Sequence, residues 1–328
     1  MRFEISKYEK VYSFELDGVA QLCGQNIQSK TFIFESIRRY FGTYKYSEET
    51  NPWRDNIKID GDVLGRKYFQ VVSIRQKEDM LQHIRLTKKS MLLEYIHEMI
   101  QKFSFQQHLQ QIDIELEKMY LELNQHIEDM GDIRLSYDIC DVWDMVQESN
   151  VETEEGDLID DKESFEVIDI FLRMLEQLQQ QKPRKLLVLF ENIDHMINID
   201  EYKECIKKME KLSRKYDIQF ICSTSLEYYV MITPELCEGI SVFGEEILQM
   251  PDLEHLLDCI QMQYPYEKEW TEEHIQEYLS QIIQQIGQNS YLKDIQSNVL
   301  CKIINKSLLL EEKMEFNMTQ AEKAYLRS

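Results

Sequence analysis

Gly24-Gln25-Asn26-Ile27-Gln28-Ser29-Lys30-Thr31 lies near the amino terminus of the chain. This stretch matches the phosphate-binding P-loop pattern G-x-x-x-x-G-K-[ST] at every fixed position except one, because Ser29 stands where the second glycine belongs. In a P-loop, backbone N–H groups wrap around phosphates, and the glycines allow an approach that a side chain resists. The stretch predicts a fold of the nucleotidase type and leaves open whether a nucleotide still binds.

The residues on either side of this stretch support the P-loop interpretation. Residues 13–22 alternate and end apolar, as a strand does, and residues 32–41 have apolar side chains at helical spacing. Strand, glycine-led loop and helix follow one another in the order that a P-loop requires. The alternative is an ordinary turn between strand and helix, with Thr31 near the helix start.

Length and composition limit the class of protein. A chain of 328 residues exceeds the usual size of one domain, and its low content of glycine (10) and proline (5) favours a helix-rich structure. The seven cysteines are scattered and form no C-x-x-C pair, which argues against a disulfide framework or a zinc site. Without a leader-like segment or a long apolar run, we expect a cytoplasmic protein without membrane contact.

The net charge of -23 initially argues against nucleic acid as a partner, because lysine and arginine supply most of the affinity for DNA. The charge is unevenly distributed, however. The formal net charge is -18 for residues 90–180, -9 for residues 181–328 and +4 for residues 1–89. One central acidic segment therefore accounts for most of the excess, and basic surfaces remain possible elsewhere.

The apolar run Leu186–Phe190 predicts the buried centre of a parallel sheet. A helix over 199–216 and a second buried strand over 218–222 would complete a right-handed βαβ unit. Residues 240–243 and 246–250 are expected to form edge strands, Asp60-Gly61 to form a hairpin turn followed by a strand over 68–74, and residues 133–137 to form a short strand. We expect two long helices within 77–130, or one broken near Phe103, and another helix over 165–181.

These elements predict an α/β fold with three parts. An ABC ATPase-like P-loop NTPase head with a parallel sheet core would comprise residues 1–86 and 183–250. A helical leg with the acidic segment would be inserted at 87–182. Residues 251–328 would add a C-terminal helical extension of three or four helices.

The residues that should accompany a working P-loop are altered. The magnesium-binding Asp and catalytic Glu should end a buried strand, but this strand ends Phe190-Glu191-Asn192, and neither register supplies both carboxylates. Ser225 stands where transporter-type ATPases place a phosphate-sensing histidine, and no Ser-Gly-Gly-Gln signature occurs. We expect no hydrolysis, and no catalytic residue.

The order and spacing of these motifs resemble the long form of the type II-A CRISPR spacer-acquisition protein, the Csn-two family, over roughly residues 1–250. The features of this chain that carry the resemblance are the altered P-loop, the helical insertion, the acidic stretch 135–144, and the segments 186–192 and 219–222. The resemblance implies an ATPase-like head without activity, bound calcium, and a homotetrameric ring threaded by the end of double-stranded DNA. It also implies a role in CRISPR adaptation, in antiviral defence, together with the integrase and the effector nuclease.

Basic residues at helical spacing, and others near the P-loop, are candidates to contact DNA phosphates in such a ring. Four copies of one modest basic stripe would make a positive channel despite the acidic exterior. The alternative is a solvated helix face. The candidate DNA-binding residues are Lys30, Arg38, Arg39, Lys58, Lys203, Lys207, Lys208, Lys211 and Arg214.

Calcium requires several converging carboxylates. Asp138, Asp141 and Asp144 have helical spacing, and Asp132 could approach from the preceding segment. Family members carry more acids just before the position of Tyr137, where this chain has Arg134 and Ser136. A solvated acidic turn is the alternative to a metal site.

Three hypotheses follow for function. The first is a non-enzymatic, sequence-independent clamp on double-stranded DNA ends that acts in spacer acquisition. The second is an ATP-dependent DNA-repair or ABC-type ATPase subunit, and the third is a helical interaction protein.

Overall fold

The structure is a computed structural model, and it describes residues 1–42, 55–131, 133–136, 146–244, 246–265, 270–288 and 294–310. The chain divides into two compact units. The first contains residues 1–75 and 184–328, and the second contains residues 76–183. The inserted unit therefore begins and ends between strands of the first unit's main sheet.

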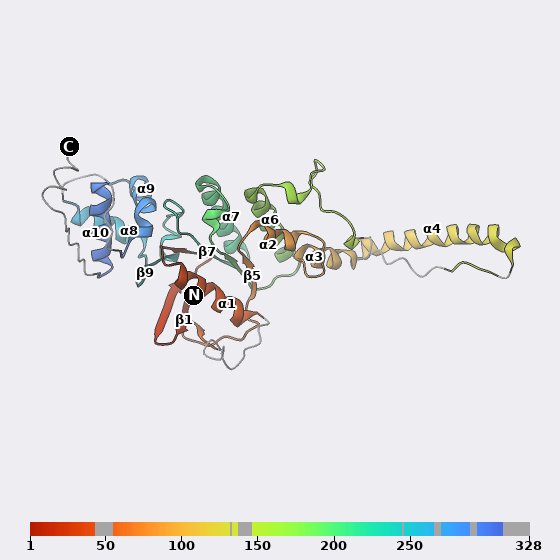
Figure 1. Ribbon diagram of the computed structural model, residues 1–328, viewed down its shortest axis with the longest axis horizontal. Coiled ribbons are helices and arrows are strands. Elements are labelled where there is room, and N and C mark those ends of the chain that lie inside the picture. Colours follow the sequence, from red (N-terminus) through yellow and green to blue (C-terminus); the bar gives the residue numbers. More distant parts are fainter. Residues whose placement is uncertain are drawn as a thin grey trace. The chain divides into compact units, whose positions relative to one another are not determined.

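A six-stranded sheet with the order β5-β6-β7-β3-β8-β9 forms the centre of the first unit (Figure 1). All neighbouring strands are parallel except β9, which pairs antiparallel with β8. The strands are β3 (Val19–Cys23), β5 (Gln70–Ile74), β6 (Leu186–Phe190), β7 (Ile218–Ser223), β8 (Ile240–Phe243) and β9 (Ile247–Gln249). The predicted α/β fold with a parallel core is confirmed.

Strand β6 is wholly buried because strands flank it on both sides and its five residues are apolar. Val188 pairs with Val72 of β5 and with Phe220 of β7. Helix α7 (Ile199–Lys215) connects β6 to β7, so the predicted βαβ unit is confirmed. The 3-10 turn η4 (Ile193–His195) lies between β6 and α7.

The prediction of one strand over residues 13–22 is wrong. The chain turns at Gly18, whose φ of +74° favours glycine, and thereby separates β2 (Lys10–Glu15) from β3. Strand β2 pairs instead with β1 (Arg2–Lys7), and β4 (Ile57–Ile59) lies on the other side of β1, in a small antiparallel sheet. The predicted hairpin turn at Asp60-Gly61 is confirmed, since both residues have positive φ and Ile59 bridges to Asp62.

Helix α1 (Ile27–Phe41) starts within the P-loop stretch, directly after Asn26, and buries Phe32, Ile33, Phe34 and Ile37. These side chains join a core with apolar residues of both sheets. Burial of this face fixes the beginning of α1 at the end of β3, which is the position that a P-loop requires.

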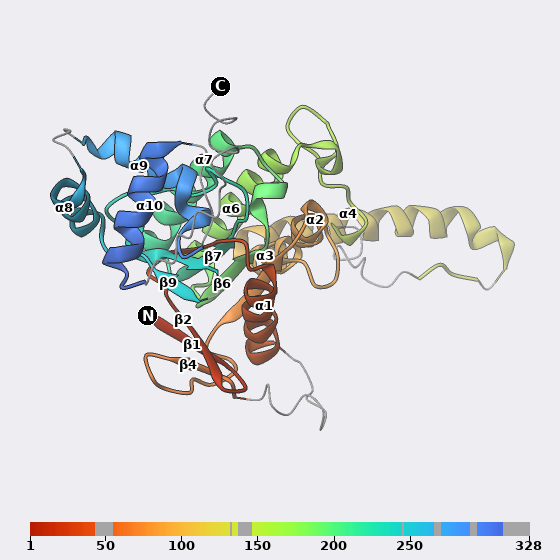
Figure 2. The same cartoon turned by 60° about the vertical axis from the view of Figure 1, so that its left-hand side comes forward.

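The C-terminal part of the first unit consists of helices that share a core with the main sheet (Figure 2). They are α8 (Leu253–Gln263), α9 (Glu272–Ile282) and α10 (Ile295–Ser307), with the 3-10 turn η6 (Ile283–Gln285) after α9. Ile260, Ile283 and Ile304 belong to the same buried cluster as Cys23 and Val242 of the sheet. Helical residues beyond position 251 are therefore packed against strands of the head.

Residues 77–130 of the second unit form three α-helices where two were predicted, and a further helix follows at Ser164–Gln181. They are α2 (Lys77–Ile84), α3 (Met91–Ile100), α4 (Phe103–Ile127) and α6 (Ser164–Gln181). Ser90 starts α3, because its hydroxyl accepts a hydrogen bond from the Leu93 N–H. Among the helices that the structure describes, none combines the length and the hydrophobicity needed to span a bilayer.

Residues 133–136 do not form the predicted strand. Their backbone instead bonds to α4, since the Asn124 side chain donates to the Leu135 carbonyl at 3.0 Å and accepts from the Leu135 N–H at 2.7 Å. The Asn124 side-chain amide thus forms the hydrogen bonds to this backbone that a neighbouring strand would otherwise form.

Candidate functional site

The carboxyl ends of β3, β6 and β7 meet at one edge of the main sheet, because the three strands are adjacent and parallel. The P-loop residues follow β3, Glu191 follows β6, and Thr224 and Ser225 follow β7. In open α/β sheets this edge is the usual place for a ligand. The three segments that we singled out in the sequence are therefore brought together.

Several backbone N–H groups of the P-loop are bonded to oxygen atoms of the protein itself. The Gly24 N–H donates to Oε1 of Gln284, and the Asn26 N–H donates to the Phe243 carbonyl at 3.0 Å. At the start of α1, the Asn26 side chain accepts from the Ser29 N–H at 3.1 Å, and its carbonyl accepts from the Lys30 N–H at 3.3 Å. The side-chain carboxamides of Gln284 and Asn26 thus accept hydrogen bonds from backbone N–H groups of the kind that bind phosphates in a working P-loop.

Lys30 is directed into the protein and is only 2% exposed. Its ammonium donates to the Gly24 carbonyl at 2.6 Å, to the Thr224 carbonyl at 2.6 Å and to the Ser225 hydroxyl at 2.8 Å. An ammonium has three N–H donors, so these three acceptors use all of them. In this conformation Lys30 has no donor left for a phosphate.

Burial lowers the pKa of Lys30 to about 8, against the attraction of Cys23 and Asp194. The same burial raises the pKa of the neighbouring Cys23 thiol to about 11, although Thr224 and Lys30 oppose the rise. Lys30 therefore carries a charge at neutral pH in a site that stabilises it through protein acceptors rather than through water.

Asp194 fixes the loop after β7. Its Oδ2 accepts hydrogen bonds from the Ser225 N–H at 2.6 Å and the Leu226 N–H at 2.9 Å, and the side chain is only 3% exposed. We did not predict this residue from the sequence, because an aspartate in the short turn after β6 carries no motif. Its effect is to hold the Ser225 hydroxyl next to Lys30.

Glu191, the remaining acid at the end of β6, lies in a mostly buried ion pair with Arg38 of α1. Its Oε1 is 3.1 Å from Nη1 of Arg38 and accepts from the Ser73 hydroxyl at 3.3 Å. Arg38 also contacts Glu35 at 2.5 Å, and Arg39 contacts Glu35 at 3.0 Å. Burial raises the pKa of Glu191, opposed mainly by Arg38. These two arginines are thus already paired with carboxylates.

The basic residues of α7 have a different environment. Lys203, Lys207, Lys211 and Arg214 are all exposed, and spacings of four, four and three residues place them along one face. Lys208 is half-buried and pairs with Glu204 at 2.6 Å, and Arg214 pairs with Glu210 at 2.6 Å. Lys58, the candidate on β4, is also exposed. The α7 face is therefore the most continuous basic surface among the predicted DNA-binding residues.

A cavity of about 530 Å³ lies beside the α7 face. Lys203 and Lys207 line it together with Glu273 and Glu277 of α9, and residues 228 and 230–233 contribute the rest of the wall along with Gln276 and Ser280. Two acids of the C-terminal helices thus lie near two of the candidate DNA-binding lysines.

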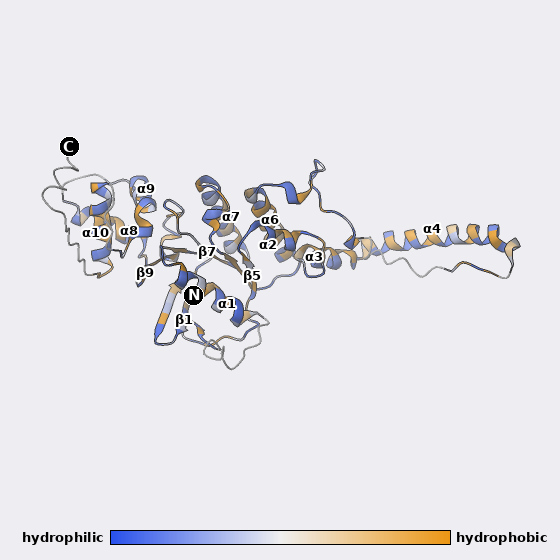
Figure 3. Cartoon of the chain, viewed as in Figure 1, coloured by the Kyte–Doolittle hydropathy of each residue, from blue (hydrophilic) through white to orange (hydrophobic). Residues whose placement is uncertain are grey.

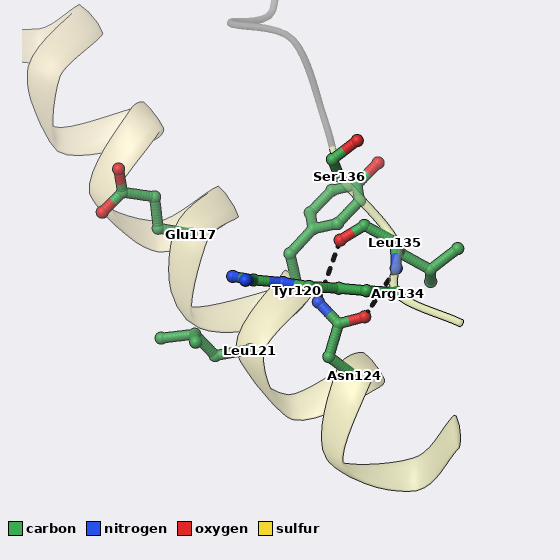
Figure 4. A pocket seen from close by; sticks show the side chains of 7 residues that line it. All are labelled: Glu117, Tyr120, Leu121, Asn124, Arg134, Leu135 and Ser136. Carbon is green, nitrogen blue, oxygen red and sulfur yellow. Dashed lines mark hydrogen bonds between the residues drawn. The ribbon is translucent and has the colours of Figure 1, made fainter. Parts of the chain in front are cut away.

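A second cavity of about 530 Å³ lies along α4 in the inserted unit (Figure 4). Glu117, Tyr120, Leu121 and Asn124 line it from the helix, and residues 134–136 line it from the returning chain. Asp132, Asp138, Asp141 and Asp144 lie outside the described residues, so the calcium site remains a prediction. Within the residues that are described, no group of three or more potential ligands could hold a metal ion.

Comparison with known families places the chain. A model of the CRISPR-associated protein Csn2, subfamily St, matches residues 6–317. The chain belongs to this Csn2 subfamily. A CRISPR-associated role and a link to defence follow from membership. No curated protein is similar enough in sequence to count as a match.

One solved structure agrees with this assignment at the level of the fold. The crystal structure of Stu0660 of Streptococcus thermophilus superimposes with a TM-score of 0.83 at 20% sequence identity, and covers 100% of this chain and 99% of that one. CbiO1 from Clostridium perfringens, part of the ABC transporter complex cbiONQ, matches with a TM-score of 0.42 at 11% identity, over 80% of this chain and 95% of that one. The predicted family and fold class are confirmed.

Proposed function

We propose that this chain is a non-enzymatic protein that binds the ends of double-stranded DNA without sequence preference and acts in CRISPR adaptation. It would do so as a homotetrameric ring in the cytoplasm, with calcium as cofactor and with the integrase and the effector nuclease as partners. Membership in the Csn2 subfamily supports the CRISPR context.

The observation that carries the proposal is that groups of the P-loop form hydrogen bonds within the protein itself. Both Lys30 and the Gly24 N–H bond to protein oxygens, and Glu191 is paired with Arg38. Phosphoryl transfer requires donors and a carboxylate that are free to meet phosphate and metal. A nucleotide would have to break these buried bonds before it could be positioned, which favours a non-enzymatic role.

The exposed face of α7 supports binding to DNA phosphates. Lys203, Lys207, Lys211 and Arg214 span 12 residues of one helix, which corresponds to roughly 16 Å between the first and the last. Contacts from such side chains to phosphates position a protein on a duplex but do not read bases. The proposed binding is therefore independent of sequence and sensitive to salt.

Helix α4 supports assembly with further copies of the chain. None of its side chains is buried, yet its apolar residues follow the alternating spacing of three and four that is typical of a coiled-coil seam (Figure 3). Within this seam Phe105 is 41% exposed, Ile112 44% and Met119 47%. An exposed apolar stripe on a 25-residue helix is best explained by a second copy that covers it.

Binding of linear and closed circular duplexes at several salt concentrations tests the proposal. A ring that admits DNA ends should bind linear duplex more tightly, and affinity should fall as salt rises. Replacing Lys203, Lys207 and Lys211 by alanine should reduce the salt dependence, by about 0.9 in log-log slope for each lost phosphate contact. The matched control replaces the exposed Lys88 and Lys89, which lie in the inserted unit.

Equal affinity for linear and circular DNA would contradict end binding, and an effect of the control as large as that of the α7 variant would contradict the proposed surface. Phosphate release from ATP in the presence of DNA, abolished by Lys30→Ala, would instead favour the ATP-dependent DNA-repair or ABC-type ATPase alternative. Particle mass with calcium and with a chelator tests the ring and its metal together.

A further inference from the structure

Gln284 connects the C-terminal helices to the P-loop and belongs to no motif of nucleotide-binding proteins. It lies in η6, directly after α9, and is fully buried. Its neighbours Ile282, Ile283 and Ile286 are also fully buried, so the backbone that carries Gln284 is anchored in the core. The side chain is therefore held in place from behind.

Both ends of the Gln284 carboxamide are bonded. Its Oε1 accepts from the Gly24 N–H, and its Nε2 donates to the Leu226 carbonyl at 3.2 Å and contacts the Thr224 hydroxyl at 3.4 Å. One side chain thus joins the segment after β7 to the start of the P-loop, which lies 260 residues before Gln284 in the sequence. Buried groups of this kind need such partners, because water cannot reach them.

Gly24 has the conformation that directs its N–H toward Gln284. Its φ is +98°, and a Cβ at this position would lie 2.4 Å from the Phe243 carbonyl oxygen. Only glycine fits there without a shift of the backbone. The first glycine of the P-loop pattern is therefore used here, and the acceptor opposite its N–H is an amide oxygen of the same chain.

We propose that the P-loop of this chain is a docking site for its own C-terminal segment, with the Gln284 carboxamide as a built-in ligand in the place of a phosphate. The docking holds η6 and the adjoining helix α9 against the carboxyl edge of the main sheet. This role is independent of DNA binding, and it assigns a present use to a loop that the sequence marks only as altered.

Hydrogen exchange on the full-length protein tests the docking. Gln284→Met keeps the side-chain volume but removes both hydrogen-bonding ends, and Gln281→Met is the control from the same helical segment. In Gln284→Met we expect the hydrogen-exchange rate to rise about tenfold or more in two sets of peptides, those that contain Gly24 and those from residues 272–288. The reason is that buried donors and acceptors lose their partners. Exchange in β6 should not change, and the control should behave like the wild type.

Gln284→Asn is a second variant for the case that Gln284→Met does not fold. Its carboxamide is one carbon shorter and cannot bridge Gly24 to Leu226, so it should show the same local rise. Unchanged exchange at Gly24, or an equal rise in β6, would overturn the proposal. Protection of Gly24 in the wild type by added pyrophosphate would overturn it as well, because the docked Gln284 already occupies that N–H.

Discussion

Replacing Lys30 by methionine should change how the stability of the protein depends on pH. The pKa of Lys30 falls from 10.5 to about 8 in the folded state, because burial disfavours the charged form. Between these two values the unfolded chain binds more protons than the folded protein, so the wild type gains stability as pH rises. Methionine has a similar volume and no charge, so the variant lacks this contribution.

The size of the effect follows from the shift in pKa. A difference of about 2.5 pKa units corresponds to about 3 kcal/mol, of which about 2.5 kcal/mol should develop between pH 7 and pH 10. The contribution of Lys30 to the free energy of unfolding is lost as the pH falls toward 8 and is fully present only above 10.5. Relative to Lys30→Met, the wild type should therefore gain about 2.5 kcal/mol in the free energy of unfolding over this range.

Urea unfolding of both proteins at pH 7, 8, 9 and 10, with reductant present, measures this difference. Subtracting the two free energies cancels the titration of groups that both proteins share. Lys58→Met is a control, since it makes the same substitution at an exposed lysine. A difference between wild type and Lys30→Met that stays constant from pH 7 to pH 10 would refute the argument that Lys30 is a buried, desolvated cation.

Three further predictions concern the P-loop and the α7 face. Gly24→Ala should destabilise the protein by more than about 1 kcal/mol, because its Cβ would clash with the Phe243 backbone at a positive φ; thermal unfolding that matches the wild type would contradict this. Asn26→Ala removes the side chain that caps α1 and should cost about 1 kcal/mol in urea unfolding, whereas Asn26→Asp should retain most of the stability. Glu273→Gln combined with Glu277→Gln should raise affinity for duplex DNA severalfold at low salt if the α7 lysines contact phosphates, and an unchanged affinity would separate the α9 acids from the DNA surface.

Local sequence patterns were sufficient to predict the strands and the helix that have the strongest signals in the sequence. Leu186–Phe190 is a strand with the predicted bounds, because five consecutive apolar residues can be buried on both faces only inside a sheet. The βαβ unit through α7 followed from the same reasoning. The predicted strand over 13–22 failed because the positive φ of Gly18 divides it between two sheets.

The candidate site was only partly predictable. Glu191 and Ser225 were found because they end adjacent strands, and the altered P-loop was found by its pattern. Asn26 had a local signal that could have been used, since an asparagine three residues before Ser29 is typical of a helix start. Gln284 had no such signal, because its partners lie about 60 and 260 residues away in the sequence.

By itself, the sequence determined the class of fold, the Gly-to-Lys loop at the end of a strand and the basic face of α7. These features depend on apolar periodicity and on residue spacing, which act over a few positions of the chain. Tertiary structure alone decided what the loop binds. The direction of Lys30, the pairing of Glu191 with Arg38 and the insertion of Gln284 all depend on which distant groups share a buried space, and there each polar atom must find a partner within the protein.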